Sequence, residues 1–369
     1  TDDSADSGIT FNATDENPAD MNNSDAAYRL TGWFSSASGN AVSGAGNYIQ
    51  FRIGLSSLYA ATINRPARYA LVVLRYGTPR KYHAIFIRQG DEPDYVMYPG
   101  DNSLLRTVAK RFSPYNVTAS NMGNNDEVVD VGPLFPVSVF TDYPSQAGFF
   151  QWANDPNPLA YNPIYPVKPT FWADALDGQY WNMLSSTQES CPPGYRRPSD
   201  GITDYAAANT STTGIESSEI RQSLYVIPTF GDANSRDNFR WGFYADGFFD
   251  RRDHNNPFVS STHGEFTSAM KANTAVSWKS KDVAYIGTLI FNPDAGSLRE
   301  NASLFIPAAG TRHSDAGLLI EGGEASVFLS SSAPNITQMW YFVGTEVGSY
   351  QLSSTRRHGL SLRCVPIAN

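Results

Sequence analysis

The two cysteines of this chain, Cys191 and Cys364, restrict its fold more than any other feature. Two cysteines among 369 residues are too few for a small disulfide-rich fold. Their wide separation fits a single cross-link that closes a large domain, worth roughly 5 kcal/mol in the chain-entropy model. The alternative is two buried thiols that are not bonded to each other. The exported character of the rest of the chain favours the disulfide, because thiols oxidise outside the cytoplasm.

The composition favours a turn-rich β or α+β protein. The chain has 20 Tyr, 21 Phe and 7 Trp, with 29 Gly and 23 Pro. Its formal net charge of −9 argues against a nucleic-acid partner. Arginine outnumbers lysine 21 to 6. Because arginine forms planar hydrogen-bonded pairs that lysine cannot, many of these arginines are expected to be structural.

The chain also has the features of an exported protein. No run of about 18 apolar residues occurs, so no transmembrane segment is expected. The sequence begins at Thr1, which suggests a mature or recombinant piece whose signal peptide lies upstream. Residues 1–25 contain seven acidic residues and no Lys or Arg, and they are expected to form a partly disordered acidic leader. The expected location is extracellular, at the outer-membrane surface.

Residues 26–95 are expected to form a β-sandwich. Apolar and polar residues alternate from Tyr69 to Tyr76 and from Lys81 to Gln89 around a Gly-Thr-Pro turn, which predicts a β-hairpin. The hairpin resembles the last one in the immunoglobulin-like modules of Bacteroidales surface proteins. The charged, proline-containing segment from Asp91 to Asp94 is expected to be a linker, with a domain boundary between Arg88 and Leu105.

Four ordered motifs carry a second resemblance. Cys191 opens CPPGYRRPSD, Phe305 opens FIPAAGTR, Ser326 opens SVFLSS, and His358 opens HGLSLRCV. These segments resemble the Fibrobacter major paralogous domain family, although Leu329 stands where that family usually has tryptophan. The resemblance implies a larger C-type-lectin-like α+β domain over residues 96–369, with its core at 130–369. Such domains are common on Bacteroidales surface proteins and fimbrial tips.

Local patterns predict further elements within this region. Helices are expected over Ser103–Phe112, from a cap at Ser199 or Asp200 toward Ala208, and over Glu216–Leu224. The expected strands are Val283–Phe291, Ser303–Ile306, Ser326–Leu329, Met339–Val343 and Leu360–Cys364. The fold class is therefore α+β and rich in β-structure, with an immunoglobulin-like sandwich followed by the lectin-like domain.

Sequence motifs for catalysis and metal binding are absent. The chain lacks nucleophile-elbow, zincin, P-loop, C-x-x-C and EF-hand patterns, and its five histidines are scattered. Glu92-Pro93-Asp94 and Asn292-Pro293-Asp294 have the composition of lectin calcium loops but lack a Trp-Asn-Asp partner at the right spacing, so turns are expected there. No cofactor or metal is expected, and the chain is not expected to be an enzyme.

The segment from Asn238 to Asn256 has the densest mixture of aromatic and polar residues. One interpretation is a ligand surface that combines stacking rings with hydrogen-bonding groups. The other, which is favoured, is a strand and turn braced by arginine–aspartate pairs, with the loop from His254 to Phe266 as the better binding candidate. The candidate ligand residues are Trp241, Tyr244, Asp250, Asp253, His254 and Asn255.

These features together predict a non-enzymatic adhesion or recognition protein of the bacterial cell surface. By resemblance, the most specific expectation is a fimbrial tip or minor fimbrial subunit. Its partners would be fimbrial subunits or a host or bacterial surface glycan or protein. An outer-surface carbohydrate-binding protein for glycan uptake is the first alternative. A hydrolase without a recognisable motif is the second.

Overall fold

The computed structural model describes residues 59–62, 64–76, 81–99, 106–119, 138–140, 149–151, 189–201, 217–225, 241–254, 286–292, 302–315, 317–333, 338–345 and 349–368. Within these residues the chain is rich in β-structure and has few helices, as the composition predicts. The acidic leader at 1–25, the sandwich strands before residue 59 and the helix expected beyond residue 201 lie outside this part. None of the described helices is long and apolar enough to cross a membrane.

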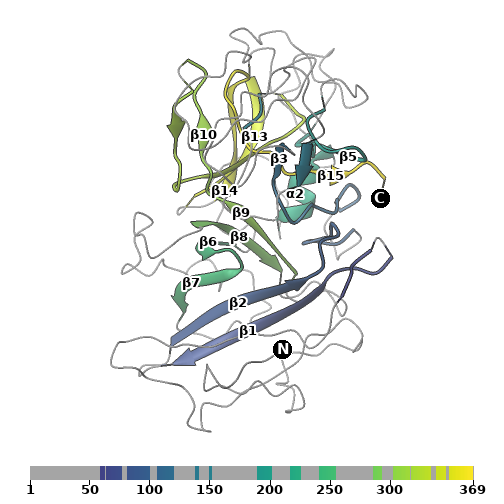
Figure 1. The fold of residues 1–369 in the computed structure, drawn as a ribbon, viewed down its shortest axis with the longest axis vertical. Coiled ribbons are helices and arrows are strands. Elements are labelled where there is room, and N and C mark those ends of the chain that lie inside the picture. The colour runs from purple at the N-terminus through teal and green to yellow at the C-terminus, as the bar shows by residue number, and fades with distance from the viewer. Residues whose placement is uncertain are drawn as a thin grey trace.

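The largest sheet has six antiparallel strands in the order β1-β2-β7-β6-β8-β9 (Figure 1). These are β1 (Arg68–Tyr76), β2 (Lys81–Gln89), β6 (Trp241–Asp246), β7 (Phe249–His254), β8 (Ile286–Asn292) and β9 (Ala302–Pro307). The last strand, β9, also contacts β1 and β2, so the sheet curls toward closure. Ala67, Tyr69 and Ala302 form a small apolar cluster where the two ends of the sheet approach each other.

The predicted β1–β2 hairpin is confirmed, with Tyr76 opposite Lys81 and Arg68 opposite Gln89. On its other side β2 pairs with β7, which lies more than 150 residues later in the chain. One sheet therefore contains strands from both sides of the expected domain boundary. The division into a sandwich at 26–95 and a lectin-like domain at 96–369 stays a prediction.

The expected linker at residues 91–94 is not an exposed connection. Pro93 and Asp94 are buried, and the Asp94 backbone forms an antiparallel bridge with Phe112. Asp91 remains exposed, and its carboxylate accepts a hydrogen bond from the Tyr115 hydroxyl at 2.9 Å. The segment therefore packs against residues 112–115 instead of spanning a gap.

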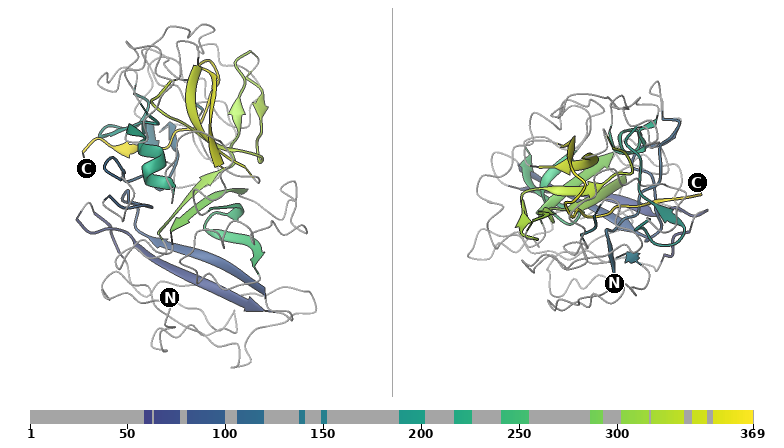
Figure 2. Two further views of the ribbon diagram at one scale, coloured as in Figure 1. Left: turned by 180° about the vertical axis from the view of Figure 1, so that it is seen from behind. Right: turned by 90° about the horizontal axis from the view of Figure 1, so that it is seen from above.

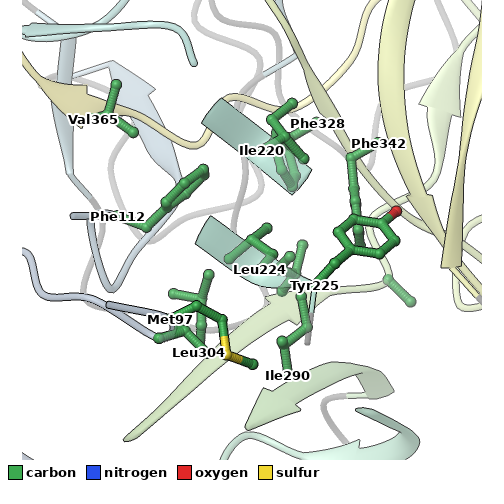
Figure 3. Packing of buried hydrophobic residues seen from close by; sticks show 13 residues of the cluster. Met97, Phe112, Ile220, Leu224, Tyr225, Ile290, Leu304, Phe328, Phe342 and Val365 are labelled. Atoms are coloured by element: carbon green, nitrogen blue, oxygen red, sulfur yellow. The ribbon is translucent and has the colours of Figure 1, made fainter. Parts of the chain in front are cut away.

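A second, three-stranded sheet is formed by β12 (Ser326–Leu329), β13 (Gln338–Gly344) and β14 (Ser349–Thr355). Its strand β12 is buried on both faces. Phe328 and Phe342 stack at 4.8 Å between ring centroids in one core cluster (Figure 3), whereas Val327 and Leu329 belong to another. The alternation follows from the two-residue period of a strand. Leu329 therefore packs in this second cluster.

Helix α2 (Glu219–Leu224) confirms the expected helix in a shorter form. Ser218 is its N-cap, and the Ser218 hydroxyl accepts the Arg221 amide hydrogen. Ile220 and Leu224 pack between the two sheets, in the same core cluster as Ile290 and Phe328 (Figure 3). The helix thus lies beside the junction of the sheets in both side views (Figure 1, Figure 2).

The helix expected over Ser103–Phe112 is not found over its described part, 106–112. Side chains of α2 take the backbone hydrogens that a helix would use internally. The Val108 amide donates to Gln222 Oε1 at 2.9 Å, and the Lys110 amide donates to Ser223 Oγ at 2.7 Å. The apolar residues at helical spacing therefore belong to an irregular segment that packs on α2.

The strand expected over Leu360–Cys364 is also absent as a continuous strand. The segment pairs with a different part of the chain at almost every residue. Leu360 exchanges backbone hydrogen bonds with Phe150, whereas the Leu362 and Cys364 carbonyls accept from Val117 and Ser113. Because Phe150 lies on a different segment from Ser113 and Val117, no single ladder forms.

Candidate functional site

The predicted disulfide joins Cys191 to Cys364. Both cysteines are buried, and their Cα atoms lie 6.1 Å apart. Next to the disulfide, β5 (Tyr195–Arg196) pairs with β15 (Val365–Pro366), and the Ile367 amide donates to the Gly194 carbonyl at 2.9 Å. The bond therefore joins the first and last family-like motifs where their backbones already pair.

Glu189 and Arg197 form the first ion pair beside the disulfide. Glu189 Oε1 lies 3.7 Å from Arg197 Nε and accepts the Cys191 amide hydrogen at 2.9 Å. Arg197 is fully buried and also donates to Ser190 Oγ at 3.1 Å. Desolvation raises the pKa of Glu189, although Arg197 and the backbone donors oppose this. The pair fixes the start of the motif.

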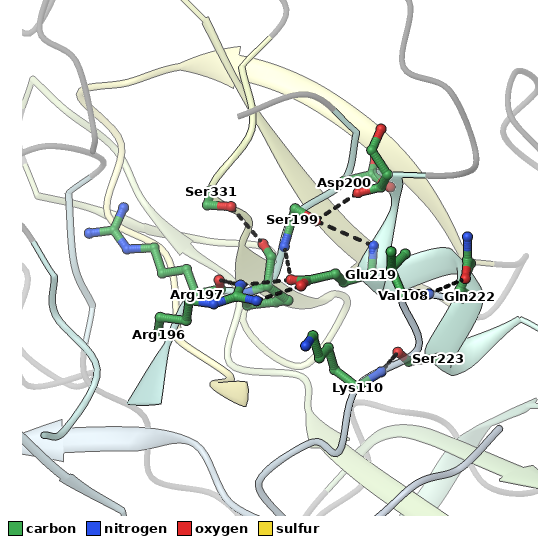
Figure 4. Close-up of polar contacts among 12 residues, drawn as sticks. Val108, Lys110, Arg196, Arg197, Ser199, Asp200, Glu219, Gln222, Ser223 and Ser331 are labelled. Carbon is green, nitrogen blue, oxygen red and sulfur yellow. Dashed lines mark hydrogen bonds and ion pairs between the residues drawn. The ribbon is translucent and has the colours of Figure 1, made fainter. Parts of the chain in front are cut away.

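Arg196 makes a two-pronged ion pair with Glu219, the first residue of α2 (Figure 4). The Arg196 Nη1 to Glu219 Oε2 distance is 2.7 Å, and Glu219 Oε2 also accepts the Ser199 amide hydrogen at 2.8 Å. Burial lowers the pKa of Arg196, but the hydrogen bonds and charge of Glu219 outweigh burial and raise it overall. Such bidentate pairs give geometric specificity as well as energy.

Asp200 forms a third buried carboxylate site. It is fully buried, accepts from Arg221 Nε at 3.2 Å, and accepts from the Ser218 hydroxyl. Desolvation raises the pKa of Asp200, whereas Arg221 and Ser218 oppose it. Alongside, the Ser331 hydroxyl donates to the Pro198 carbonyl at 3.3 Å (Figure 4), and the Ser331 amide donates to the same carbonyl at 2.8 Å. The serines after β12 therefore join the same framework.

Many arginines of the described chain are structural, as expected. Arg197, Arg312, Arg356 and Arg363 are among the largest fully buried side chains. Arg363 of the closing motif donates to the Phe305 carbonyl at 2.7 Å and to the Ser113 carbonyl at 3.2 Å. The buried arginines of the motifs thus bind separate chain segments to one another.

The FIPAAGTR segment ends in β10 (Thr311–Arg312), which pairs with β11 (Leu319–Ile320) to form a small hairpin. Gly310 has φ +71°, and a Cβ atom there would lie 2.3 Å from the Ile320 carbonyl oxygen. Buried Arg312 donates to the Gly317 carbonyl at 2.9 Å and lies over the Phe149 ring. Gly310 and Arg312 of this motif therefore hold the hairpin in position through contacts with the Ile320 and Gly317 carbonyls.

We expect Gly310→Ala to destabilise the protein by about 2 kcal/mol more than Gly247→Ala. Both glycines have positive φ, but a Cβ at Gly247 meets nothing within 4 Å, whereas one at Gly310 clashes with the backbone of β11. Urea unfolding of the two variants measures the difference. Equal losses would show that the hairpin backbone moves freely away from Gly310.

The hairpin exposes three consecutive large apolar side chains. Leu318 is 51% exposed, Leu319 41% and Ile320 39%. Three exposed acids, Asp315, Glu321 and Glu324, border them, and Glu321 itself has φ +56°. We call residues 313–315 and 317–324, which include all of these, the hairpin surface. A cluster of exposed apolar side chains with a polar border is typical of an interaction site.

Two histidines lie at the base of the hairpin surface. The His313 and His358 rings lie 4.7 Å apart, and the Ser314 amide donates to His358 Nδ1 at 3.1 Å. Burial is the main cause that lowers the pKa of His358 to about 4, and His313 and Arg357 add to it while Asp315 opposes it. His358 is therefore neutral near pH 7 and acts as a hydrogen-bond acceptor.

The depressed pKa of His358 is expected to make the free energy of unfolding fall as the pH drops from about 6.5 to about 4. Over this range the unfolded chain binds a proton that the folded chain does not, so acid favours unfolding. Allowing for the partial exposure of the ring, the contribution is about 1 kcal/mol. His358→Asn, which keeps an acceptor without titrating, should flatten this part of the urea-unfolding profile. If the variant shows the same pH dependence as the wild-type chain, the role given to His358 is wrong.

The predicted ligand residues lie elsewhere, on the six-stranded sheet. Trp241 and Tyr244 are in β6, and Asp250, Asp253 and His254 are in β7, whereas Asn255 lies outside the described residues. Both strands are internal, since β7 lies between β2 and β6. His254 thus ends a strand and does not begin a loop. The backbone supports the strand-and-turn interpretation of this segment, and its role in binding stays a prediction.

The hairpin surface was not among the sequence predictions. Its signal is a Leu-Leu-Ile run between Gly317 and Gly322-Gly323, short enough for a tight hairpin, but exposure cannot be inferred from that run alone. Among the described residues, no three His, Cys, Asp or Glu side chains are arranged to hold a metal ion.

Comparisons with known proteins add no relative to this geometry. A scan of protein-family models, a search of curated proteins and a search of solved structures each found no match to the chain. The resemblance to the Fibrobacter major paralogous domain family stays a prediction, carried by the four motifs themselves.

Proposed function

We propose that this chain is a non-enzymatic adhesion or recognition protein of a bacterial cell surface, in which a disulfide-closed C-terminal region presents binding segments. One observation carries the proposal. The motif residues build a buried framework, and the hairpin that this framework holds exposes Leu318, Leu319 and Ile320 to solvent.

The chemistry of the framework supports this function. The carboxylates of Glu189, Asp200 and Glu219 are each bound to an arginine and to further donors. A carboxylate held in this way stabilises the fold and is poorly placed to exchange protons with a substrate. The disulfide between Cys191 and Cys364 is a feature expected of a protein exposed outside the cell.

The family-like motifs make the proposal more specific. By that resemblance, the chain is a fimbrial tip or minor fimbrial subunit at the outer-membrane surface. Its partners would be fimbrial subunits, or a glycan or protein of a host or bacterial surface.

Purified chain immobilised on beads is expected to bind to host epithelial cells or to partner bacteria, and to co-purify with appendages sheared from its own cells. The test compares binding of chain-coated and albumin-coated beads by microscopy. Binding no greater than that of albumin, together with absence from sheared appendages, would overturn the proposal. Selective binding to polysaccharides on a glycan array, without cell binding, would favour the glycan-uptake alternative.

A further inference from the structure

The outer edge of β11 is unpaired within the described part of the chain. Arg312 exchanges backbone hydrogen bonds with Gly359 on the far side of β10, at 2.8 and 2.9 Å. Successive residues of a strand direct their N–H and C=O groups to opposite sides. Leu319, opposite Arg312, therefore directs its N–H and C=O away from β10.

The neighbouring hydrogen bond agrees with this ladder. The His313 amide donates to the Leu318 carbonyl at 2.9 Å, so Leu318 faces β10 and Leu319 faces outward. In the described residues no backbone hydrogen bond is made by Leu319 at this edge. An open strand edge that carries exposed apolar side chains is a template for another strand.

The edge is also held in place before any partner arrives. Gly310 packs against the Ile320 carbonyl, and the buried Arg312 side chain binds the Gly317 carbonyl. The hairpin lies at the margin of the molecule in both side views (Figure 1, Figure 2). A preformed edge lowers the entropy lost on binding.

The charges carried by the hairpin itself indicate the kind of partner. Residues 313–324 contain three acids, Asp315, Glu321 and Glu324, and no Lys or Arg. All three acids are exposed. A second copy would bring the same acids to the edge on a chain of net charge −9, which is unfavourable. A basic strand would meet opposite charges.

We propose that the outer edge of β11 is a strand-addition site for an extended segment of a partner protein with alternating apolar and basic side chains. Backbone hydrogen bonds to Leu319 would align the segment. Its apolar side chains, all on one face of the added strand, would lie beside Leu318 and Ile320, and its Lys or Arg side chains would lie near Asp315, Glu321 and Glu324. The proposal deepens the proposed recognition function and rests on it only for the origin of the natural partner.

The probe is the fluorescent peptide (Val-Lys)4, tested by polarisation with the whole oxidised chain. We expect it to bind, and we expect (Val-Glu)4 not to bind. A (Val-Lys)4 peptide with N-methylated valines keeps the charge but loses backbone donors, so it should bind at least about tenfold more weakly. Equal binding of the N-methylated peptide would overturn strand addition and leave charge attraction alone. No binding of (Val-Lys)4 would also overturn it.

Two variants locate the site. Leu319→Pro removes the outward N–H, and Leu318→Ser/Ile320→Ser removes two exposed apolar side chains; each should weaken (Val-Lys)4 binding about tenfold. Ile367→Ser is the matched control, because Ile367 is 59% exposed near the C-terminal end, away from the hairpin. If Leu319→Pro unfolds the chain, the serine variant and the N-methylated peptide decide the question. Equal loss with Ile367→Ser would overturn the assignment.

Two further results separate this inference from the proposed function. If wild-type chain self-associates in sedimentation and Leu319→Pro abolishes this, the edge belongs to a second copy and the proposal is overturned. If the peptide fails to bind while chain-coated beads still adhere to cells, strand addition is wrong and the recognition function stands. Peptide binding without any adhesion would contradict the proposed function instead.

Discussion

Removing the disulfide is expected to lower the free energy of unfolding by about 4 kcal/mol, within the usual range for a native disulfide. Cys191 and Cys364 close a loop of 173 residues, so the bond strongly restricts the unfolded chain. Both sulfur atoms also pack in an apolar cluster with Leu360 and Leu362, so a free thiol there gains nothing from water. Urea unfolding of Cys191→Ala, Cys364→Ala and the double variant measures the loss.

The pattern among these variants tests whether one bond is the cause. Each single variant should lose about as much as the double variant, because either substitution breaks the same bond. Wild-type chain under dithiothreitol should unfold at nearly the same urea concentration as the double variant. A double-variant loss below about 1 kcal/mol would contradict the assigned role, as would native thiols that react with an alkylating reagent.

Elements with strong local patterns could be predicted from the sequence. The β1–β2 hairpin follows from alternation around Gly-Thr-Pro, and α2 lies within the helix expected over Glu216–Leu224. Four of the five strands expected after residue 280 are found, β12 with the expected ends and β8, β9 and β13 with shifted ends. In each of these, the local pattern and the tertiary contacts favour the same structure.

The remaining elements depend on partners distant in sequence. Residues 106–112 have helical spacing, but Gln222 and Ser223 bind the backbone amides of Val108 and Lys110 across more than a hundred residues. The pairing of β2 with β7 likewise has no local signal. Loop closure over such distances is decided by the whole packed structure.

The candidate site was predictable only in part. The motifs around Cys191, Phe305 and His358 indicated which segments matter, and the arginine excess indicated that guanidinium groups would be structural. The aromatic density at 238–256 was compatible with a ligand surface or with a braced strand and turn, and the backbone of 241–254 forms the internal strands β6 and β7, which fits the second interpretation. The exposure of Leu318–Ile320 could not be foreseen, because three apolar residues in a row usually indicate burial.

Removing the charge of either Arg196 or Glu219 alone is expected to lower the free energy of unfolding by about 3 kcal/mol. Their side chains are only 12% and 9% exposed, so either one left alone keeps a charge in a poorly solvated place. Glu219→Gln is the most informative single change, since it keeps the shape and removes the charge that Arg196 requires. It also weakens the acceptor for the Ser199 amide, which lies 2.8 Å from Glu219 Oε2.

A double-mutant cycle isolates the pair from the packing around it. Arg196→Met and Glu219→Leu should each be strongly destabilising, whereas the double variant should recover at least about 2 kcal/mol of the summed loss, because no unpaired charge remains. Lys110 provides a second measurement. Burial lowers the pKa of Lys110 and Glu219 opposes this, so Glu219→Leu should lower that pKa further. A coupling energy below about 0.5 kcal/mol between Arg196 and Glu219 would mean that the pair behaves as an exposed one. The link between the cysteine motif and α2 would then depend on the apolar packing of Ile220 and Leu224 instead.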